Sequence, residues 1–177
     1  MPFPEKGIFY IRGKIFMSNL VGIILKETGL DRWPPFVKDR LFLLALTGGV
    51  ITCLIIWLTI APTFSLQDRT ISKLFFMGVI YYPVLEEILF RGIIQGSIIK
   101  KAWGIKKYLH LTGANWSSSV LFVFAHFWYQ PMLWALMLFV PSLIFGFFRD
   151  RYSSIYPCIG LHMFYNAVFI LVNLIAQ

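Results

Sequence analysis

Charge is scarce in this 177-residue chain, and this scarcity limits what the protein can be. Only 14% of the residues are Asp, Glu, Lys or Arg, whereas 58% are hydrophobic and the mean hydropathy is +0.73. A soluble domain of this composition would expose a largely apolar surface. The composition therefore excludes an ordinary soluble domain and predicts a polytopic membrane protein.

Acidic residues and cysteines are both few. Eight Asp and Glu stand against sixteen Lys and Arg, which gives a net charge of +8. The basic residues lie mostly between apolar segments, so they indicate membrane topology and not nucleic-acid binding. Cys53 and Cys158 are too few and too isolated for a disulfide framework or a thiolate metal site, and we expect both to be packing residues. The N-terminus has no pattern of a cleavable signal peptide, so we expect the first span to act as an uncleaved anchor.

Segments that lack charge divide the chain into an N-terminal arm and a membrane domain. Residues 1–40 are predicted to be a cytoplasmic or interfacial arm, in which Ile15–Leu25 forms part of an amphipathic helix at the membrane surface. Residues 41–177 are predicted to be the transmembrane domain, so the expected fold is an all-α bundle. Its five predicted spans are Leu41–Ala61, Ile71–Ile99, Asn115–Trp128, Pro131–Phe148 and Ser154–Ala176.

Glycine and proline mark details of these spans. The pair Gly48-Gly49 is expected to allow close helix packing in the first span. Pro62 should end that span, and Thr63–Thr70 should form a short polar loop. The sequence Tyr129-Gln130-Pro131 is expected to break an uncharged stretch into a tight helical hairpin.

Lys and Arg alternate between the loops and predict the orientation. The arm carries seven, the loop after the second span four and the loop after the fourth span two, whereas the intervening loops have one or none. This alternation predicts a cytoplasmic N-terminus and a C-terminus on the other side of the membrane. We expect a multi-pass protein of a prokaryotic cytoplasmic membrane.

The segment Tyr81–Gly92 carries three ionisable groups inside an apolar span. Charges in hydrocarbon cost at least about 2.5 kcal/mol each at mid-depth, so they usually pair or serve a function. Glu87 and Arg91 are four residues apart and share a helix face, which predicts an internal ion pair. Glu86 is rotated by roughly 140° from Arg91 and needs another partner. We therefore interpret Glu87 and Arg91 as supporting residues and Glu86 as the reactive carboxylate.

Pro83 lies three residues before Glu86. A proline removes one backbone hydrogen bond and can kink the helix, so a carbonyl freed beside the carboxylate could hold a water. The alternative is an ordinary proline tolerated in a membrane helix.

Two of the three histidines also lie in predicted spans. His162 shares a face with Asn166, and His126 shares one with Phe122, because four residues separate each pair. A single histidine in a membrane often only bonds one helix to another. Glu86, His126 and His162 are all predicted to lie in the membrane interior, however, where polar groups must pair with one another. A carboxylate beside an imidazole can deprotonate a water. An imidazole and an amide can donate to a developing oxyanion.

These polar residues form three motifs that resemble those of one family. The motifs, in order on successive apolar segments, are Glu86-Glu87-xxx-Arg91, Phe122-xxx-His126 and His162-xxx-Asn166. They resemble the CPBP family, which includes the type II CAAX prenyl endopeptidases and the Abi-type intramembrane proteases, over about residues 70–170. The resemblance implies an intramembrane endopeptidase whose substrate is a membrane-anchored protein or peptide.

The same resemblance implies a role for each matching residue. Glu86 would activate water together with His126. His162 and Asn166 would stabilise the oxyanion, with Arg91 supporting the site. Small family members also resemble proteases that process C-terminal sorting signals, and others are linked to bacteriocin immunity.

Two alternatives stay open at this point. Glu86, His126 and His162 are a valid zinc ligand set, although no HExxH spacing is present and zinc would leave little role for Asn166. We expect no cofactor, with zinc as the alternative. The second alternative is a membrane protein without enzymatic activity, such as an immunity factor that binds a toxin.

Overall fold

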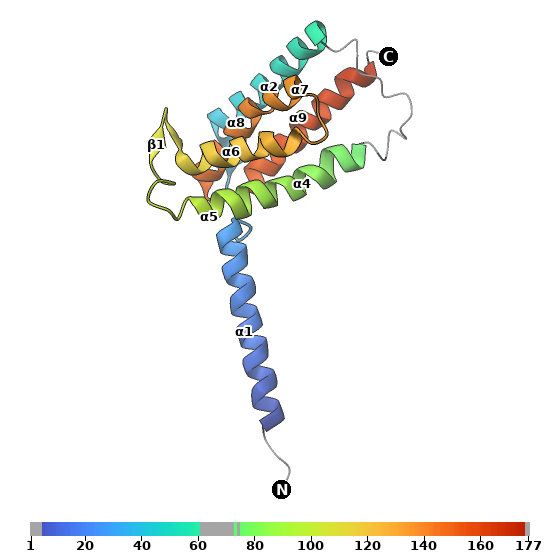
Figure 1. Ribbon diagram of the computed structural model, residues 1–177. Coiled ribbons are helices and arrows are strands. Elements are labelled where there is room, and N and C mark those ends of the chain that lie inside the picture. Colours follow the sequence, from blue (N-terminus) through green and yellow to red (C-terminus); the bar gives the residue numbers. More distant parts are fainter. Residues whose placement is uncertain (1–4, 61–72, 74, 176–177) are drawn as a thin grey trace.

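The computed structural model describes residues 5–60, 73 and 75–175, and it is built almost entirely from helices. Two long helices, α1 (Glu5–Thr28) and α2 (Arg40–Ile60), precede the gap with the short 3₁₀ helix η1 (Phe36–Lys38) between them, and the remaining elements follow the gap (Figure 1). The elements after the gap are η3 (Phe76–Tyr81), α4 (Tyr82–Glu87), η4 (Ile88–Gln95), α5 (Gly96–Ile98), β1 (Lys107–Tyr108), β2 (Leu111–Thr112), α6 (Gly113–His126), α7 (Met132–Met137), α8 (Phe139–Tyr152) and α9 (Tyr156–Ile175).

Three helical segments among the described residues are long and apolar enough to cross a membrane. They are Arg40–Leu58, Met132–Tyr152 and Tyr156–Leu174. They coincide with the first, fourth and fifth predicted spans. The expected all-α membrane bundle is therefore confirmed.

The second predicted span is one helical run of mixed type. From Phe76 to Ile98 the chain alternates between π-helix (η3 and η4) and α-helix (α4 and α5), whereas the sequence suggested an ordinary helix. Pro83 lies at the start of α4, directly after η3, and it cannot donate the backbone hydrogen bond of a regular helix. π-Helical turns often occur at functional sites. Pro62 and the predicted loop Thr63–Thr70 lie outside the described residues.

The third and fourth predicted spans form a helical hairpin. Helix α6 begins after Thr112, whose side chain accepts a hydrogen bond from the Asn115 amide, and ends at His126. Helix α7 begins at Met132, so the break predicted at Tyr129–Pro131 is present. The fourth span is divided into α7 and α8 at Leu138.

A short antiparallel hairpin of strands β1 and β2 was not predicted. Lys107 pairs with Thr112, and Tyr108 pairs with Leu111. The two turn residues, Leu109 and His110, have positive φ angles of 51° and 68°. Hairpins of this type normally place Gly or Asn at such positions, so the sequence gave no signal for the turn.

Helix α1 (Glu5–Thr28) contains the predicted interfacial segment and is longer than expected. It meets the bundle at its C-terminal end and projects away at a steep angle to the other helices (Figure 1). The location of this helix at the membrane surface stays a prediction. The Arg149 side chain joins α1 to the bundle, because Nη2 donates to the Glu27 carbonyl and Nε donates to the Arg91 carbonyl.

An aromatic core joins helix α2 (Arg40–Ile60) to α8 and α9. Gly49 allows the close approach that the sequence suggested, because a Cβ there would collide with the Tyr165 ring, whereas Gly48 faces open space. Cys158 is buried in this core, and Cys53 is half-buried; both are free thiols. The core residues are Phe36, Phe42, Phe145, Phe148, Cys158, Leu161 and Tyr165.

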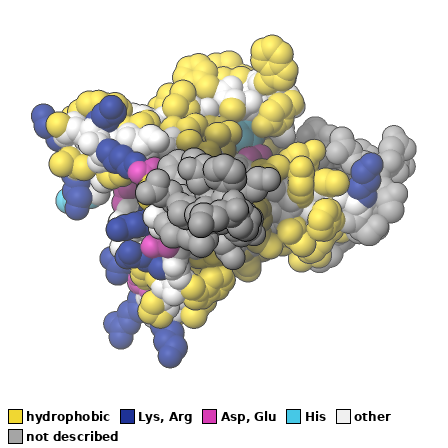
Figure 2. All heavy atoms as spheres, turned by 90° about the horizontal axis from the view of Figure 1, so that it is seen from below, with side chains coloured by type: hydrophobic (Ala, Val, Ile, Leu, Met, Phe, Trp, Pro, Cys, Tyr) yellow, Lys and Arg dark blue, Asp and Glu magenta, His cyan; other side chains and the backbone are white. Residues whose placement is uncertain are grey.

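Lys and Arg side chains gather at one end of the bundle (Figure 2). We call it the basic end and define it by the C-terminal ends of α5 and α8, the β1–β2 hairpin and the start of α2. It contains Lys38, Arg40, Lys100, Lys101, Lys106, Lys107, Arg149 and Arg151.

Candidate active site

The pair Glu87–Arg91 lies at the centre of the bundle. Arg91 Nε is 3.2 Å from Glu87 Oε2, and both side chains are completely buried. Neither of these two atoms has a hydrogen-bond partner among the described residues, so the contact is an ionic one. The expected internal ion pair is therefore present.

Arg91 connects the helical run from Phe76 to Ile98, which we call the central helix, to its neighbours. Nη1 donates to Ser118 Oγ on α6 at 3.0 Å, and Nη2 donates to Ser142 Oγ on α8 at 2.8 Å. The guanidinium carbon also lies 5.3 Å from the centre of the Phe122 ring, which adds a cation–π contact. Through these contacts one side chain fixes three helices relative to one another.

Glu86 points to a different place from Glu87, as the helix geometry requires. Its Oε2 lies 3.9 Å from His126 Nε2 and 3.7 Å from His162 Nε2. The side chain is 23% exposed, whereas that of Glu87 is fully buried. Residues from three separate helices, α4, α6 and α9, thus converge on one carboxylate oxygen.

The other ring nitrogen of each histidine is held by an acceptor. His126 Nδ1 lies 2.8 Å from the Phe122 carbonyl, and His162 Nδ1 lies 2.9 Å from Glu87 Oε1. A carbonyl or carboxylate can only accept, so we assign the proton to Nδ1 in both rings. Nε2 of each ring then faces Glu86 Oε2.

Glu87 has a second function that the sequence did not reveal. One of its oxygens pairs with Arg91, and the other orients His162. Helix spacing relates Glu87 to Arg91, but no spacing relates it to a residue 75 positions away. This contact makes Glu87 part of the support of the imidazole.

Asn166 reaches the central helix and not His162. Its Nδ2 donates to the Gly78 carbonyl at 2.8 Å. In the π-helix η3 each carbonyl accepts from the amide five residues later, as in the bond from Tyr82 to Met77. The amide five residues after Gly78 belongs to Pro83, which has no N–H. Pro83 thus frees a carbonyl, as the sequence suggested, and the Asn166 side chain occupies it.

Aromatic rings fix the two imidazoles. The centres of the Phe122 and His126 rings are 4.4 Å apart. The Phe145 ring stacks on the His162 ring, with 5.1 Å between their centres and an interplanar angle of 24°. The sequence indicated Phe122 but not Phe145, Ser118 or Ser142. Gln95 is another buried polar residue of the central helix that we did not single out. It lies four residues after Arg91 and shares its helix face, so this spacing could have identified it.

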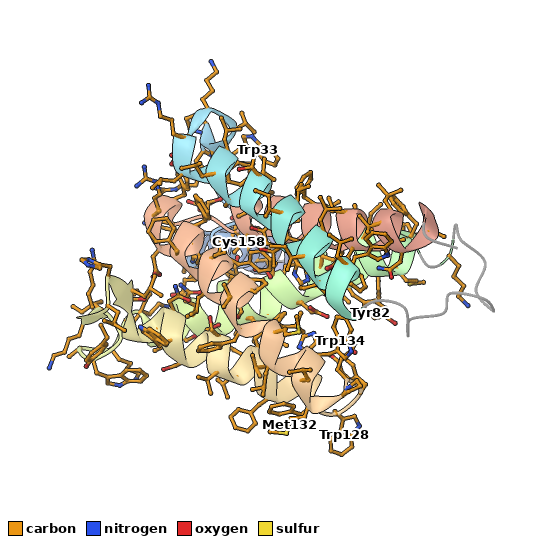
Figure 3. The ribbon with its side chains drawn as sticks, turned by 90° about the horizontal axis from the view of Figure 1, so that it is seen from above. Trp33, Tyr82, Trp128, Met132, Trp134 and Cys158 are labelled. Carbon is orange, nitrogen blue, oxygen red and sulfur yellow. The ribbon has the colours of Figure 1, made fainter. Side chains whose placement is uncertain are left out.

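Exposed aromatic side chains lie near the carboxylate. His126 is followed by Trp128 and Tyr129, and the Tyr129 ring lies 5.4 Å from the His126 ring. Trp128 is 92% exposed and projects outward together with Met132 (Figure 3). Tyr82 on α4 and Trp134 on α7 lie on the same side of the bundle (Figure 3). This side of the bundle therefore exposes apolar side chains.

The donor types at the centre also suit zinc. Zinc-binding histidines usually donate their second N–H to a carbonyl or carboxylate, which both rings do here. In the part of the chain that the structure describes, however, no three His, Cys, Asp or Glu residues are close enough to form a metal cluster. Glu86, His126 and His162 therefore fit zinc by chemistry but not by their present spacing.

Fold and site together define an integral membrane protein with a carboxylate and two imidazoles in its interior. The family model of type II CAAX prenyl endopeptidase Rce1-like proteins matches residues 69–168, more than half of the chain. The chain belongs to this family of intramembrane proteases, and the resemblance seen in the three motifs is confirmed. No curated protein and no solved structure matches the chain.

Membership defines the general activity. The protein is a hydrolase of the CAAX protease type, and its substrate is a membrane-associated peptide or protein. The matched region contains Glu86, Glu87, Arg91, Phe122, His126, His162 and Asn166.

Proposed function

We propose that this protein cleaves peptide bonds by means of a water activated by Glu86 and His126. The observation that carries the proposal is the convergence of Glu86 Oε2, His126 Nε2 and His162 Nε2. Glu86 Oε2 and, in a neutral ring, His126 Nε2 are acceptors. A water placed among them donates its hydrogens to Glu86 and His126 and turns an oxygen lone pair toward the substrate carbonyl. Glu86 takes the proton and passes it to the leaving amine.

His162 and Asn166 supply the oxyanion donors in this mechanism. A second proton on His162 leaves Glu86, Glu87, Arg91 and the imidazolium with no net charge, and it makes Nε2 a donor. Asn166 uses one Nδ2 hydrogen on the Gly78 carbonyl and keeps the other for the oxyanion. Side-chain donors suit a membrane helix, whose backbone N–H groups are committed to the helix. Removal of one such donor costs about 10²–10³ in rate.

A single-turnover experiment in H₂¹⁸O tests the attack by water. Purified protein in proteoliposomes, in molar excess, is mixed with a membrane-anchored reporter peptide. We expect ¹⁸O in the new carboxyl group from the first turnover, since the oxygen comes directly from solvent. An unlabelled first product would show that a protein carboxylate attacks the peptide, and it would overturn the proposal.

The substrate proposed from the family resemblance is the C-terminal segment of a membrane-anchored protein, such as a sorting signal. Two sets of reporters test this. One set carries an apolar anchor at the C-terminus and the other carries the same anchor at the N-terminus. Each set includes a cleavable and a scrambled flanking sequence. Cleavage confined to reporters with a C-terminal anchor supports the assignment. Equal cleavage of N-terminally anchored reporters contradicts it.

Zinc is the second candidate, because both Nδ1 atoms are held as in zinc-binding histidines. Bound zinc would polarise the carbonyl, and Glu86, His126 and His162 would hold it. Elemental analysis of active protein and assays in chelator decide between the two. We expect activity without stoichiometric metal; one zinc per chain, lost and restored together with activity, would establish the metal-dependent form.

The proposed orientation places the basic end in the cytoplasm, in accordance with the distribution of Lys and Arg. Reporter fusions after Lys107 and Gln177 should report opposite sides of the membrane. Reports from the same side would contradict the orientation.

A further inference from the structure

Two tyrosine side chains lie near the reactive carboxylate and have no role in the mechanism above. Tyr82 precedes Glu86 by four residues in α4, so the two side chains share one face of that helix. Tyr129 follows His126 in the turn between α6 and α7. Both tyrosines are exposed, Tyr82 to 53% and Tyr129 to 63%. The carboxylate thus has one tyrosine on its own helix and another on a neighbouring element.

The turn after α6 holds Tyr129 against His126. The backbone amides of Tyr129 and Gln130 both donate to the His126 carbonyl, at 3.3 and 2.9 Å. The centres of the Tyr129 and His126 rings are 5.4 Å apart, with an interplanar angle of 58°. Because His126 Nε2 lies 3.9 Å from Glu86 Oε2, a peptide bond that reaches Glu86 also comes close to Tyr129.

Electrostatic contacts also relate the Tyr129 hydroxyl to Glu86 and Tyr82. Partial burial raises the pKa of Tyr129, and the Glu86 carboxylate and the Tyr82 hydroxyl raise it further. Both groups therefore lie within electrostatic reach of Tyr129. The Tyr129 hydroxyl stays protonated at neutral pH, so it can donate one hydrogen bond and can also accept.

Neither tyrosine hydroxyl has a hydrogen-bond partner within the described ranges 5–60, 73 and 75–175. Other polar groups near Glu86 are engaged inside the fold. Nδ1 of His162 is held by Glu87, and Nδ2 of Asn166 donates to a backbone carbonyl. The two hydroxyls are therefore polar groups beside the site that the described fold itself does not use.

A peptide substrate needs such groups when it enters the site. The substrate of this family is a membrane-associated peptide or protein. Its scissile amide has to leave any helix before a water at Glu86 can attack, and the neighbouring N–H and C=O groups then lose their intrahelical partners. In a membrane interior no bulk water replaces those partners, so the unwound segment is unfavourable unless the enzyme supplies donors and acceptors.

We propose that Tyr82 and Tyr129 are substrate-binding residues whose hydroxyls bind main-chain groups of the residues that flank the scissile bond. They hold the unwound segment in place at Glu86. Because the main chain is common to all peptides, this contact favours an unwound segment and does not select a particular side chain. The inference rests on the proposed role of Glu86 and adds a further contact for the same reaction.

Tyr82→Phe and Tyr129→Phe each remove one hydroxyl and keep the ring. We expect KM for the membrane-anchored reporter peptide to rise about two- to tenfold in each variant, the effect of losing one hydrogen bond, with little change in kcat. Tyr108→Phe, at the basic end, is the matched control, because Tyr108 is also 53% exposed. It should leave KM unchanged. An unchanged KM in either of the first two variants, or an equal rise in the control, overturns the inference.

The unfolding temperatures of all three variants should equal that of the unaltered chain, measured in the same detergent. This agreement is expected for Tyr82 and Tyr129 because neither hydroxyl is bonded within the described fold. A rise in KM accompanied by a lower unfolding temperature would show a structural role instead and would overturn the inference.

Ester reporters locate the contact on the substrate. In these reporters an ester replaces the amide directly before or directly after the scissile bond, which removes the N–H and weakens the carbonyl as an acceptor. For each tyrosine variant there should be one position at which variant and ester together raise KM no more than the larger single effect, since both changes remove the same hydrogen bond. Effects that multiply at both positions overturn the inference.

The ¹⁸O experiment separates this inference from the proposed mechanism. A labelled first product together with an unchanged KM in the tyrosine variants would overturn the tyrosine contacts alone. An unlabelled first product would overturn the attack by water, even if both tyrosine variants raised KM.

Discussion

Two neighbouring carboxylates on one helix have opposite surroundings. Glu87 is completely buried and engages Arg91 and His162 with its two oxygens. Glu86, the preceding residue, is 23% exposed and faces two imidazole nitrogens at 3.7 and 3.9 Å. These distances are longer than direct hydrogen bonds. Both oxygens of Glu87 therefore contact a partner within the protein, one in an ion pair and one in a hydrogen bond, whereas Glu86 makes only the longer contacts.

The comparison shows how a membrane interior can hold an active site. Charges in a low dielectric need partners, so the fold places a complete ionic set, Glu87 with Arg91, directly beside the reactive group. That set fixes the helices and one imidazole. The predictions below alter each side of this comparison in turn.

The largest effect on folding is expected for Glu87→Gln. The change leaves the Arg91 guanidinium buried without its ion partner, so the free energy of unfolding should fall by roughly 3–5 kcal/mol. Chemical denaturation in mild detergent, followed by intrinsic fluorescence, measures this loss.

Glu27→Gln is the matched control. Glu27 pairs with Lys100 at 2.6 Å, but both side chains are 53% exposed. Exposed pairs contribute about 0–1 kcal/mol. A loss in Glu87→Gln no larger than that in Glu27→Gln would show that the buried pair does not support the fold.

Asn166→Ala should reduce kcat by about 10²–10³-fold, because it removes an oxyanion donor. It should also lower stability by about 1–3 kcal/mol, since the Gly78 carbonyl loses its donor. Asn173→Ala, on the same helix and bonded to the Phe169 carbonyl, is the control and should retain activity.

A double variant separates these two effects. Pro83→Ala restores a backbone N–H near the Gly78 carbonyl. Together with Asn166→Ala it should recover stability but not activity. Recovery of both would show that Asn166 only positions the helix and takes no part in the chemistry.

The smallest effect concerns a carboxylate at the surface. Hydrogen bonds from the Tyr152 hydroxyl and the Leu41 amide, and the Arg151 guanidinium, hold the pKa of Asp39 below its ordinary value. A carboxyl whose pKa is lowered by folding stabilises the fold above its unfolded pKa, and this contribution is lost as the pH falls through the folded pKa. Asp39→Asn should therefore make the unfolding temperature less dependent on pH below about 4.

Asp31→Asn serves as the reference for this surface effect. Among the described residues, the only ion pair of Asp31 is with the adjacent Arg32, at 3.7 Å. The unfolding temperature is measured between pH 3 and pH 6 in the same detergent. An Asp39→Asn profile that parallels the profile of the unaltered chain would contradict the assigned contacts.

Regular spacing made much of this site predictable. Separation by four residues related Glu87 to Arg91 and His162 to Asn166, and scarcity of charge placed all of them in spans. The partner of Glu87 on another helix, His162, depends on helix packing, which sequence spacing does not encode. Ser118 and Ser142 gave no signal for the same reason.

Backbone features were likewise predictable only in part. Pro83 indicated a freed carbonyl, but the π-helical bonding that places it at Gly78, where Asn166 reaches it, could not be foreseen. The turn at Leu109 and His110 escaped prediction because both residues adopt a conformation that their side chains disfavour.

The most direct measurement compares Glu86→Gln with the unaltered chain in the same proteoliposomes, recording the cleavage rate and the unfolding temperature of each. Gln has the shape of Glu but cannot take a proton. The account predicts that the rate falls by at least about 10²–10⁴-fold, the contribution of a general base, while the unfolding temperature does not decrease. A Glu86→Gln protein that still cleaves at a comparable rate, or that loses activity only because it unfolds, would contradict the assignment of Glu86 as the reactive carboxylate.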